Sequence, residues 1–262
     1  MVPVGIVVNS EASGIRESFP EPQAQKALQC YLDDLKEVAD KGAHIAFLPE
    51  VSLSVYSSAR QEFLREFQKV AREKNIDIVV PFSEKDIEEK VYNQLVVITS
   101  GGEILGEYRK RYPLFGVAKK VQRGNAPPLI CECRGVRYGF IICHDDCFPR
   151  WVRYVGRKQA DVLVTPSKDW LEIAQEHKDV SLFRAIENGC TQIRITLNGY
   201  SQVVNPWGRV LYSRDSFTTP RICEVVNIPV QRRKTLYPLA GDLFAWANLI
   251  TLFYFLSMAL LQ

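Results

Sequence analysis

The chain has 262 residues, of which 47% are hydrophobic and 24% are charged, and its net charge is +3 at pH 7. This composition excludes a disordered chain, and so small a positive excess gives no support for nucleic acid as a partner. The seven cysteines show no regular spacing, which argues against a disulfide framework and favours a reducing compartment. The length fits one large α/β domain or two small ones.

The N-terminal part of the chain alternates apolar runs with amphipathic segments. An apolar run at residues 3–9 predicts a first strand, and residues 23–41 carry apolar side chains at helical spacing until Gly42 ends the pattern. A second helical pattern surrounds residues 63–71, and Gly101-Gly102 is typical of a tight turn. The further strands that we expect in this part span residues 43–48, 76–81, 92–99 and 104–108.

The centre of the chain holds an apolar run, Tyr138 to Ile142, that stops at Cys143. Pro149 favours the first turn of a helix, with Asp145 or Asp146 as its N-cap. Cys143 is therefore expected between the end of a strand and the N-terminus of a helix. Free N–H groups make such a place electropositive, which lowers the pKa of a thiol and can hold an oxyanion.

The C-terminal part of the domain continues the alternation. Residues 177–188 predict a helix that Gly189 closes, and Asn198-Gly199 is typical of a hairpin turn. Strands are predicted at residues 161–165, 192–197, 201–204, 209–212 and 222–228. Alternating strands and helices, together with several hairpins, predict a layered α/β domain with a mixed sheet and helices outside.

The end of the chain is a long apolar segment. Leu243 to Leu261 carries no charged residue, and as a helix it would span ~28 Å, about the thickness of a hydrocarbon core. We expect a C-terminal transmembrane helix that crosses once, with a buried helix as the alternative. Residues 1–230 would then form the folded domain, and residues 231–262 a basic linker and the membrane helix. The basic run 232–234 places the domain in the cytoplasm by the positive-inside rule.

Three polar residues stand where strands are expected to end: Glu50, Lys110 and Cys143. Loops at strand ends converge on a pocket in open α/β sheets, so reacting groups collect there. A thiol, a carboxylate and an ammonium supply the nucleophile, the general base and the oxyanion stabiliser of covalent catalysis. The sequence therefore predicts that Cys143 is a nucleophile, without a cofactor.

Other roles for Cys143 stay open on the residues alone. It can be an inert buried thiol, or it can pair with His44 or His177, although His44 lies in an apolar run and is interpreted as a core histidine. A zinc site is a further alternative, but its candidate ligands lack the usual spacing, and we expect no metal. Those ligands are Cys131, Cys133, Cys143, His144 and Cys147.

Three segments around these residues resemble, in the same order, the signatures of the nitrilase (carbon–nitrogen hydrolase) superfamily. They are Phe47-Leu-Pro-Glu50, Gly106-Glu-Tyr-Arg-Lys110 and Gly139-Phe-Ile-Ile-Cys143-His-Asp-Asp-Cys-Phe-Pro149. The similarity continues in residues 184–189 and 198–208 and covers nearly all of residues 1–228. It implies an α-β-β-α sandwich in which Glu50 is the base, Lys110 stabilises the oxyanion and Cys143 is the nucleophile.

A narrower similarity points to the apolipoprotein N-acyltransferase branch. It rests on Ser167-Lys-Asp-Trp170 and on residues 235–246, which run into the apolar tail as the C-terminus of that branch does. The resemblance implies a membrane-anchored enzyme outside the cytoplasm that forms a Cys143 thioester from a lipid and passes the acyl group to an amine or lipoprotein. It also implies substrate contacts from His144 and Trp170, and as a further partner a separate membrane subunit or a second copy of the chain.

Two alternatives accompany this interpretation. With water as acceptor, the same chemistry would make a membrane-anchored amidase that acts on a small amide. A catalytically idle nitrilase-like module that binds a partner at the membrane is the other. One departure from the acyltransferases bears on the choice: they carry an acid beside a Phe-Gly pair, whereas Val117 follows Phe115-Gly116 here.

Overall fold

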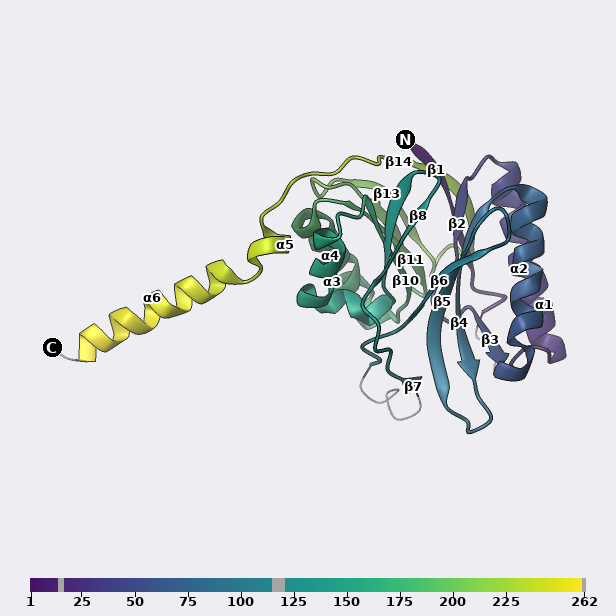
Figure 1. Cartoon of the computed structure of the whole chain (residues 1–262), viewed down its shortest axis with the longest axis horizontal. Helices are drawn as coiled ribbons and strands as arrows, with labels where there is room; N and C mark the ends of the chain where they lie inside the picture. Colours follow the sequence, from purple (N-terminus) through teal and green to yellow (C-terminus); the bar gives the residue numbers. More distant parts are fainter. Residues whose placement is uncertain (14–16, 115–120, 261–262) are drawn as a thin grey trace.

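The computed structural model describes residues 1–13, 17–114 and 121–260, and it contains two packed β-sheets with helices on both outer faces (Figure 1). This is the α-β-β-α sandwich that the family resemblance implies. Each sheet combines parallel and antiparallel pairs, because crossover helices and hairpins alternate along the chain.

The first sheet runs in the order β14-β1-β2-β4-β5-β6, with β3 beside β4 and β7 beside β5. Its strands are β1 (Val2–Asn9), β2 (Ile45–Phe47), β3 (Leu53–Tyr56), β4 (Asp77–Lys85), β5 (Val91–Ile98), β6 (Ile104–Arg109), β7 (Val121–Gln122) and β14 (Arg221–Ile228). The helices α1 (Pro22–Asp40) and α2 (Arg60–Lys74) cover its outer face, with the one-turn η1 (Ser57–Ala59) before α2. Tyr31 of α1 and Phe63 of α2 are fully buried in this layer, so the apolar stripe of each helix meets the sheet.

The second sheet runs in the order β13-β12-β11-β10-β9-β8. Its strands are β8 (Leu129–Cys133), β9 (Val136–Phe140), β10 (Val162–Lys168), β11 (Thr191–Leu197), β12 (Tyr200–Val204) and β13 (Val210–Asp215). The helices α3 (Pro149–Arg157) and α4 (Leu171–Asn188) cover its outer face.

The inner faces of the two sheets form the main core. The ring centroids of Phe47 on β2 and Tyr138 on β9 lie 6.1 Å apart, and both side chains are buried. Packing β2 against β9 brings the loops that follow these two strands to the same end of the sandwich. Those loops carry Glu50 and Cys143.

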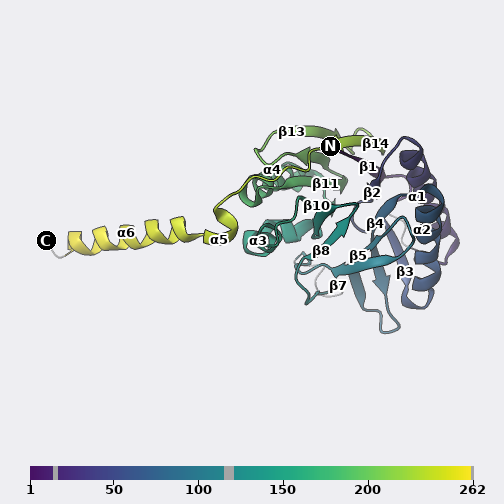
Figure 2. The ribbon, with the colours of Figure 1, turned by 45° about the horizontal axis from the view of Figure 1, so that its top comes forward.

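The chain after β14 passes over the second helical layer and forms α5 (Tyr237–Ala240) and α6 (Leu243–Leu260). Figures 1 and 2 show α6, in yellow, projecting away from the sandwich. None of its 18 residues is buried, and within the described ranges it is the one helix long and apolar enough to cross a membrane. The predicted membrane segment extends one residue further, to Leu261, which lies outside the described residues.

The structure contradicts two local predictions. Phe148, and not Asp145 or Asp146, is the N-cap of α3, without a side-chain cap bond. Asp145 instead accepts a backbone hydrogen bond from Ile142, because the one-turn helix η2 (Cys143–Cys147) separates the strand from α3. His44 is exposed and is not a core residue, since it precedes β2 on the solvent side.

Candidate active site

Cys143 begins η2, which follows β9 after Ile141 and Ile142, and the chain turns sharply there. Its φ of +46° lies in the left-handed region that residues other than glycine rarely adopt. The thiol is 1% exposed, and Sγ donates a weak hydrogen bond to the carbonyl oxygen of Lys168 at 3.7 Å. A strained residue at a strand-to-helix turn is held by its surroundings, and such strain collects at functional sites.

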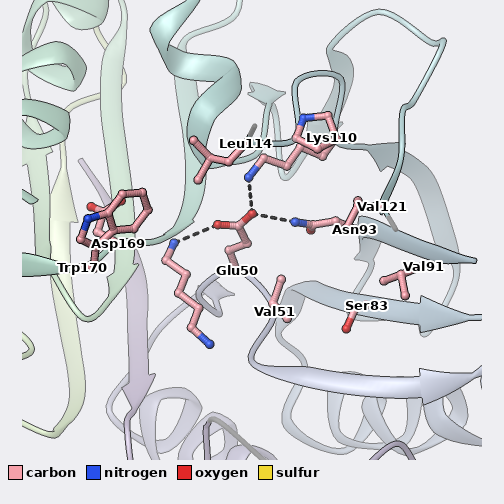
Figure 3. Close-up of a pocket in the computed structure, with 12 residues that line it drawn as sticks. Glu50, Val51, Ser83, Val91, Asn93, Lys110, Leu114, Val121, Asp169 and Trp170 are labelled. Carbon is pink, nitrogen blue, oxygen red and sulfur yellow. Dashed lines mark hydrogen bonds and ion pairs between the residues drawn. The ribbon is translucent and has the colours of Figure 1, made fainter. Parts of the chain in front are cut away.

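Glu50 follows β2 and is surrounded by hydrogen-bond donors. Its Oε1 accepts from Lys110 Nζ at 2.5 Å and from Asn93 Nδ2 at 2.6 Å, and its Oε2 accepts from the backbone N–H of Lys168 at 3.0 Å (Figure 3). All three partners are donors, so both oxygens of this carboxyl group are held in place by hydrogen bonds.

Lys110 follows β6, and its backbone N–H bonds to the carbonyl oxygen of Asn93 at 2.8 Å. Burial lowers the pKa of its ammonium, but the attraction of Cys143 and Glu50 outweighs burial and leaves the pKa above its usual value. Lys110 therefore stays positively charged beside Glu50.

The peptide groups of Lys168 join the thiol to the carboxylate. The N–H of this residue donates to Glu50, and its carbonyl oxygen accepts from Cys143. Lys168 ends β10, which pairs in parallel with β9, so the register of these strands fixes both contacts. The structure thus brings Glu50, Lys110 and Cys143 to one place.

The thiol of Cys143 is not acidified at rest. Burial raises its pKa to about 12, and the negative charge of Glu50 adds to burial while Lys110 and Arg194 oppose it. The prediction that a helix N-terminus lowers this pKa is therefore wrong, because η2 is a single turn and the thiol is closed off from solvent. Cys143 rests as a neutral thiol, so a nucleophilic attack by this residue would need a base.

A buried group of charged side chains that the sequence analysis missed lies next to the thiol. Arg194 Nη2 donates to both carboxylate oxygens of Asp169 at 3.0 Å, and His177 Nδ1 lies 2.8 Å from Asp169 Oδ1. Atoms of Cys143, Asp169 and His177 lie within 4.8 Å of one another.

His177 is protonated at neutral pH. Burial lowers its pKa, but hydrogen bonds with Asp169 and Cys147 outweigh burial and raise it to about 9. A charged imidazole is a poor acceptor for the Cys143 proton, so this geometry does not favour a dyad with His177. His44 is exposed and precedes β2, whereas the site lies after this strand, so the geometry does not favour a dyad with His44 either.

The zinc alternative finds no assembled ligand set among the residues that the structure describes. The groups close enough to share an ion are Cys143, Asp169 and His177, and Asp34, Glu37 and Cys223. Neither includes Cys131, Cys133 or His144. Arg194 and Arg221 already neutralise the acids of the first and second group, respectively.

A cavity of about 520 Å³ lies beside the Glu50–Lys110 pair. Much of its wall is apolar, and Figure 3 shows these side chains around the pair. The apolar lining residues are Val51, Val91, Pro113, Leu114, Val121 and Trp170. The cavity therefore offers an apolar surface next to a charged pair.

The two residues expected at the substrate lie in different places. Trp170 lines the cavity and is 45% exposed. His144 is absent from the lining, and its Nδ1 lies 3.1 Å from the carbonyl oxygen of Tyr112. Their contacts with substrate stay predictions. Phe115, Gly116 and Val117, where the acyltransferases differ, lie outside the described residues.

Asp145 anchors the loop that carries Lys110. Its carboxylate accepts from the backbone N–H groups of Arg111 and Tyr112, at 3.1 and 2.8 Å, and from the Tyr108 hydroxyl at 2.7 Å. The turn after Cys143 and the loop after Lys110 are therefore tied together. The acid directly before a predicted helix gave a misleading capping signal here.

Arg194 carried a signal that the sequence analysis did not use. It stands between Ile193 and Ile195 in a strand that is buried along its whole length. A charge inside a buried strand needs a buried partner. The pattern predicts a counterion, but it cannot say that the counterion is Asp169.

The comparisons with known proteins agree with the fold. Residues 16–228, more than half of the chain, match the family model described as carbon-nitrogen hydrolase. The chain belongs to the carbon–nitrogen hydrolase family of the nitrilase superfamily.

Relatives of two kinds resemble the chain. The 2-oxoglutaramate amidase of Bacillus subtilis is 29% identical over 197 residues, which span 67% of this chain and 75% of that protein. The apolipoprotein N-acyltransferase of Nitrosomonas europaea is 26% identical over 205 residues, which span 70% of this chain and 41% of that protein. The chain thus matches less than half of the acyltransferase.

Solved structures share the fold at low identity. A mutant of the amidase from Nesterenkonia sp. AN1, with acrylamide added at its active-site cysteine, superposes with a TM-score of 0.78 at 18% identity. The match covers 95% of this chain and 99% of that one.

Proposed function

We propose that this chain is a membrane-anchored N-acyltransferase-like enzyme that takes an acyl group from a lipid. Cys143 is the nucleophile, Glu50 the general base and Lys110 the oxyanion stabiliser. The observation that carries the proposal is the Glu50–Lys110 pair beside a cavity with apolar walls, next to the buried thiol. A lipid acyl chain fits such walls better than a small polar amide.

The first half of the reaction forms a thioester. Glu50 takes the proton of Cys143, and the thiolate attacks the carbonyl carbon of a lipid ester. The ammonium of Lys110 and the backbone N–H of His144 stabilise the oxyanion. The carbon–oxygen bond of the ester breaks, and the leaving alcohol takes the proton from Glu50.

The second half passes the acyl group to an amine. The amine attacks the thioester and gives a proton to Glu50, the carbon–sulfur bond breaks, and the thiol of Cys143 regains the proton. Trp170 and His144 are the proposed substrate contacts, and a lipoprotein amine is the acceptor that the resemblance implies. A separate membrane subunit or a second copy of the chain would complete the assembly.

Membrane attachment supports a lipid donor. The helix α6 is uncharged and wholly exposed, which is costly in water and favourable in a bilayer. In this proposal residues 231–262 are the linker and anchor of the catalytic domain 1–230, so the cavity is held close to lipid.

Hydrolysis of a small amide is the second candidate. Among the relatives, the 2-oxoglutaramate amidase matches a larger share of its own length than the acyltransferase does. The same three residues would serve, with water in place of the amine.

Intact-protein mass spectrometry after incubation with phospholipid separates the candidates. A hydroxylamine-labile acyl adduct in the wild type, absent in Cys143→Ala, supports the acyltransferase. Turnover of small amides without a lipid adduct supports the amidase instead. If folded protein yields neither the lipid adduct nor amide turnover, both candidates are overturned and the idle binding module remains.

A further inference from the structure

Six basic residues stand in two segments that adjoin α5, the short helix before α6. They come from the last turns of α3 and from the linker after β14, and we call them the basic collar. The collar consists of Arg153, Arg157, Lys158, Arg232, Arg233 and Lys234.

Specific contacts hold the linker against α3 and α4. Arg157 Nε donates to the carbonyl oxygen of Pro238 at 2.7 Å, and the backbone N–H of Arg233 donates to the carbonyl oxygen of Gly189 at 2.8 Å. The guanidinium of Arg153 lies 5.7 Å from the ring centroid of Tyr237 on α5. These contacts hold the linker and α5 against α3 and α4 at the base of α6, and Figures 1 and 2 show α3 and α5 side by side there.

Carboxylates in the described part of the chain do not pair with the basic residues of the collar. No ion pair within 4.0 Å joins any of the six to a carboxylate in residues 1–13, 17–114 and 121–260. Two acids lie nearby, but Glu187 pairs with Arg184, and Asp242 accepts from the hydroxyl of Tyr237. The collar therefore keeps an excess of positive charge, and four of its side chains are exposed.

In a bilayer, the base of α6 would lie at the level of the lipid headgroups. The polar headgroups begin where an uncharged helix enters the hydrocarbon, so the collar at the base of α6 would lie among them. Each Lys or Arg near a surface of anionic headgroups raises the affinity for the membrane by about a factor of five. A cluster of basic residues next to a membrane helix is the pattern that binds such lipids.

We propose that the basic collar binds anionic phospholipid headgroups of the leaflet that α6 enters. This inference rests on the membrane attachment in the proposed function. It adds that the domain lies with the C-terminal end of α3 against the bilayer, and that its contact depends on the charge of the lipid.

The test uses the full chain in nanodiscs of phosphatidylcholine, with or without about a third of phosphatidylglycerol. An impermeant amine-reactive reagent labels lysines, and peptide mass spectrometry gives the rate at each one. We expect Lys158 and Lys234 to react at least about fivefold more slowly in anionic discs, and to recover at about 1 M salt. Lys26 and Lys69, exposed on α1 and α2, should react equally in both discs.

A double variant separates lipid contact from a general surface effect. Arg233→Gln with Lys234→Gln should remove most of the protection of Lys158, whereas the matched pair Lys26→Gln with Lys69→Gln should leave it intact. Equal labelling of Lys158 in neutral and anionic discs would overturn the inference.

The outcomes also separate this inference from the proposed function. A chain that fails to enter either disc overturns membrane attachment and the collar together. A chain that enters the discs but shows no lipid-dependent labelling overturns the collar alone. The thioester at Cys143 is measured independently of both.

Discussion

Arg194 donates to both carboxylate oxygens of Asp169 at 3.0 Å, and neither side chain is more than 4% exposed. Asp169 directly follows Lys168, whose peptide groups contact Glu50 and Cys143. The ion pair therefore holds the segment against which the carboxylate and the thiol are aligned.

Removal of this arginine should destabilise the fold. Arg194→Met leaves the carboxylate of Asp169 buried without its main partner, and we expect the free energy of unfolding to fall by about 3–5 kcal/mol. Denaturant unfolding of the full chain in detergent measures this loss. Arg214→Met breaks an exposed pair with Glu224 and should cost less than about 1 kcal/mol, so similar losses in both would contradict the argument.

Loss of the proposed base should slow acylation without loss of the fold. Glu50→Gln keeps an oxygen for Lys110 but cannot take the proton of a thiol whose pKa is about 12. We expect the rate of adduct formation to fall by about 10²–10⁴-fold, measured by mass spectrometry at successive times. Ser83→Ala changes another residue of the cavity wall and should stay close to wild type. An unchanged rate in Glu50→Gln would remove this residue from the mechanism.

The stability of the domain should fall as the pH rises from about 6.5 to about 9, because folding raises the pKa of His177 from its ordinary value of 6.5 to about 9. The folded state binds the proton of His177 more tightly than the unfolded state does. The contribution of His177 to stability is therefore complete below pH 6.5 and is lost above about pH 9. The loss is roughly 3 kcal/mol for this difference in pKa.

Denaturant unfolding across this pH range measures the effect. His177→Gln should flatten the decline, since it removes the proton that links folding to pH. His44→Gln changes an exposed imidazole and serves as the control. A decline that persists in His177→Gln would assign the pH dependence to another group.

Gly139 should be intolerant of a side chain. A Cβ there would lie 2.3 Å from Cγ1 of Val155, a fully buried residue of α3. Gly139→Ala should therefore cost about 1–3 kcal/mol through overpacking, and should displace β9, the strand that leads to Cys143. Gly101→Ala, where the nearest atom is 3.5 Å away, should change stability little. Thermal unfolding of the two variants tests this argument. Equal losses of stability in both would contradict it.

Local patterns predicted most elements of the fold. The helix at residues 23–41 and the strand at 222–228 appear as α1 and β14, each with bounds close to those expected. The strands β3, β7 and β8 escaped prediction because they are short or only partly buried. The layered order of the sheets came from the family resemblance, since pairing between distant strands leaves no mark in a local pattern.

The sequence predicted that three polar residues stand at strand ends, but not the electrostatics around them. Glu50, Lys110 and Cys143 follow strands, and strand ends are visible in a sequence. The pKa of Cys143 depends on burial and on Arg194, which lies 51 residues away along the chain. The misreading of His44 has the same origin, because an apolar run does not reveal on which side of a short strand a residue lies.

The closed position of Cys143 has a consequence for its chemical lifetime. Oxidants such as peroxide attack accessible thiolates. They oxidise the thiolate first to a sulfenic acid and then, irreversibly, to sulfinic and sulfonic acids. Cys143 is protonated at rest and 1% exposed, whereas Cys30 stands on the surface of α1. Oxidative damage would therefore fall first on Cys30. In the proposed mechanism, the buried thiol would be vulnerable only in the brief interval between the loss of its proton and its acylation by the substrate.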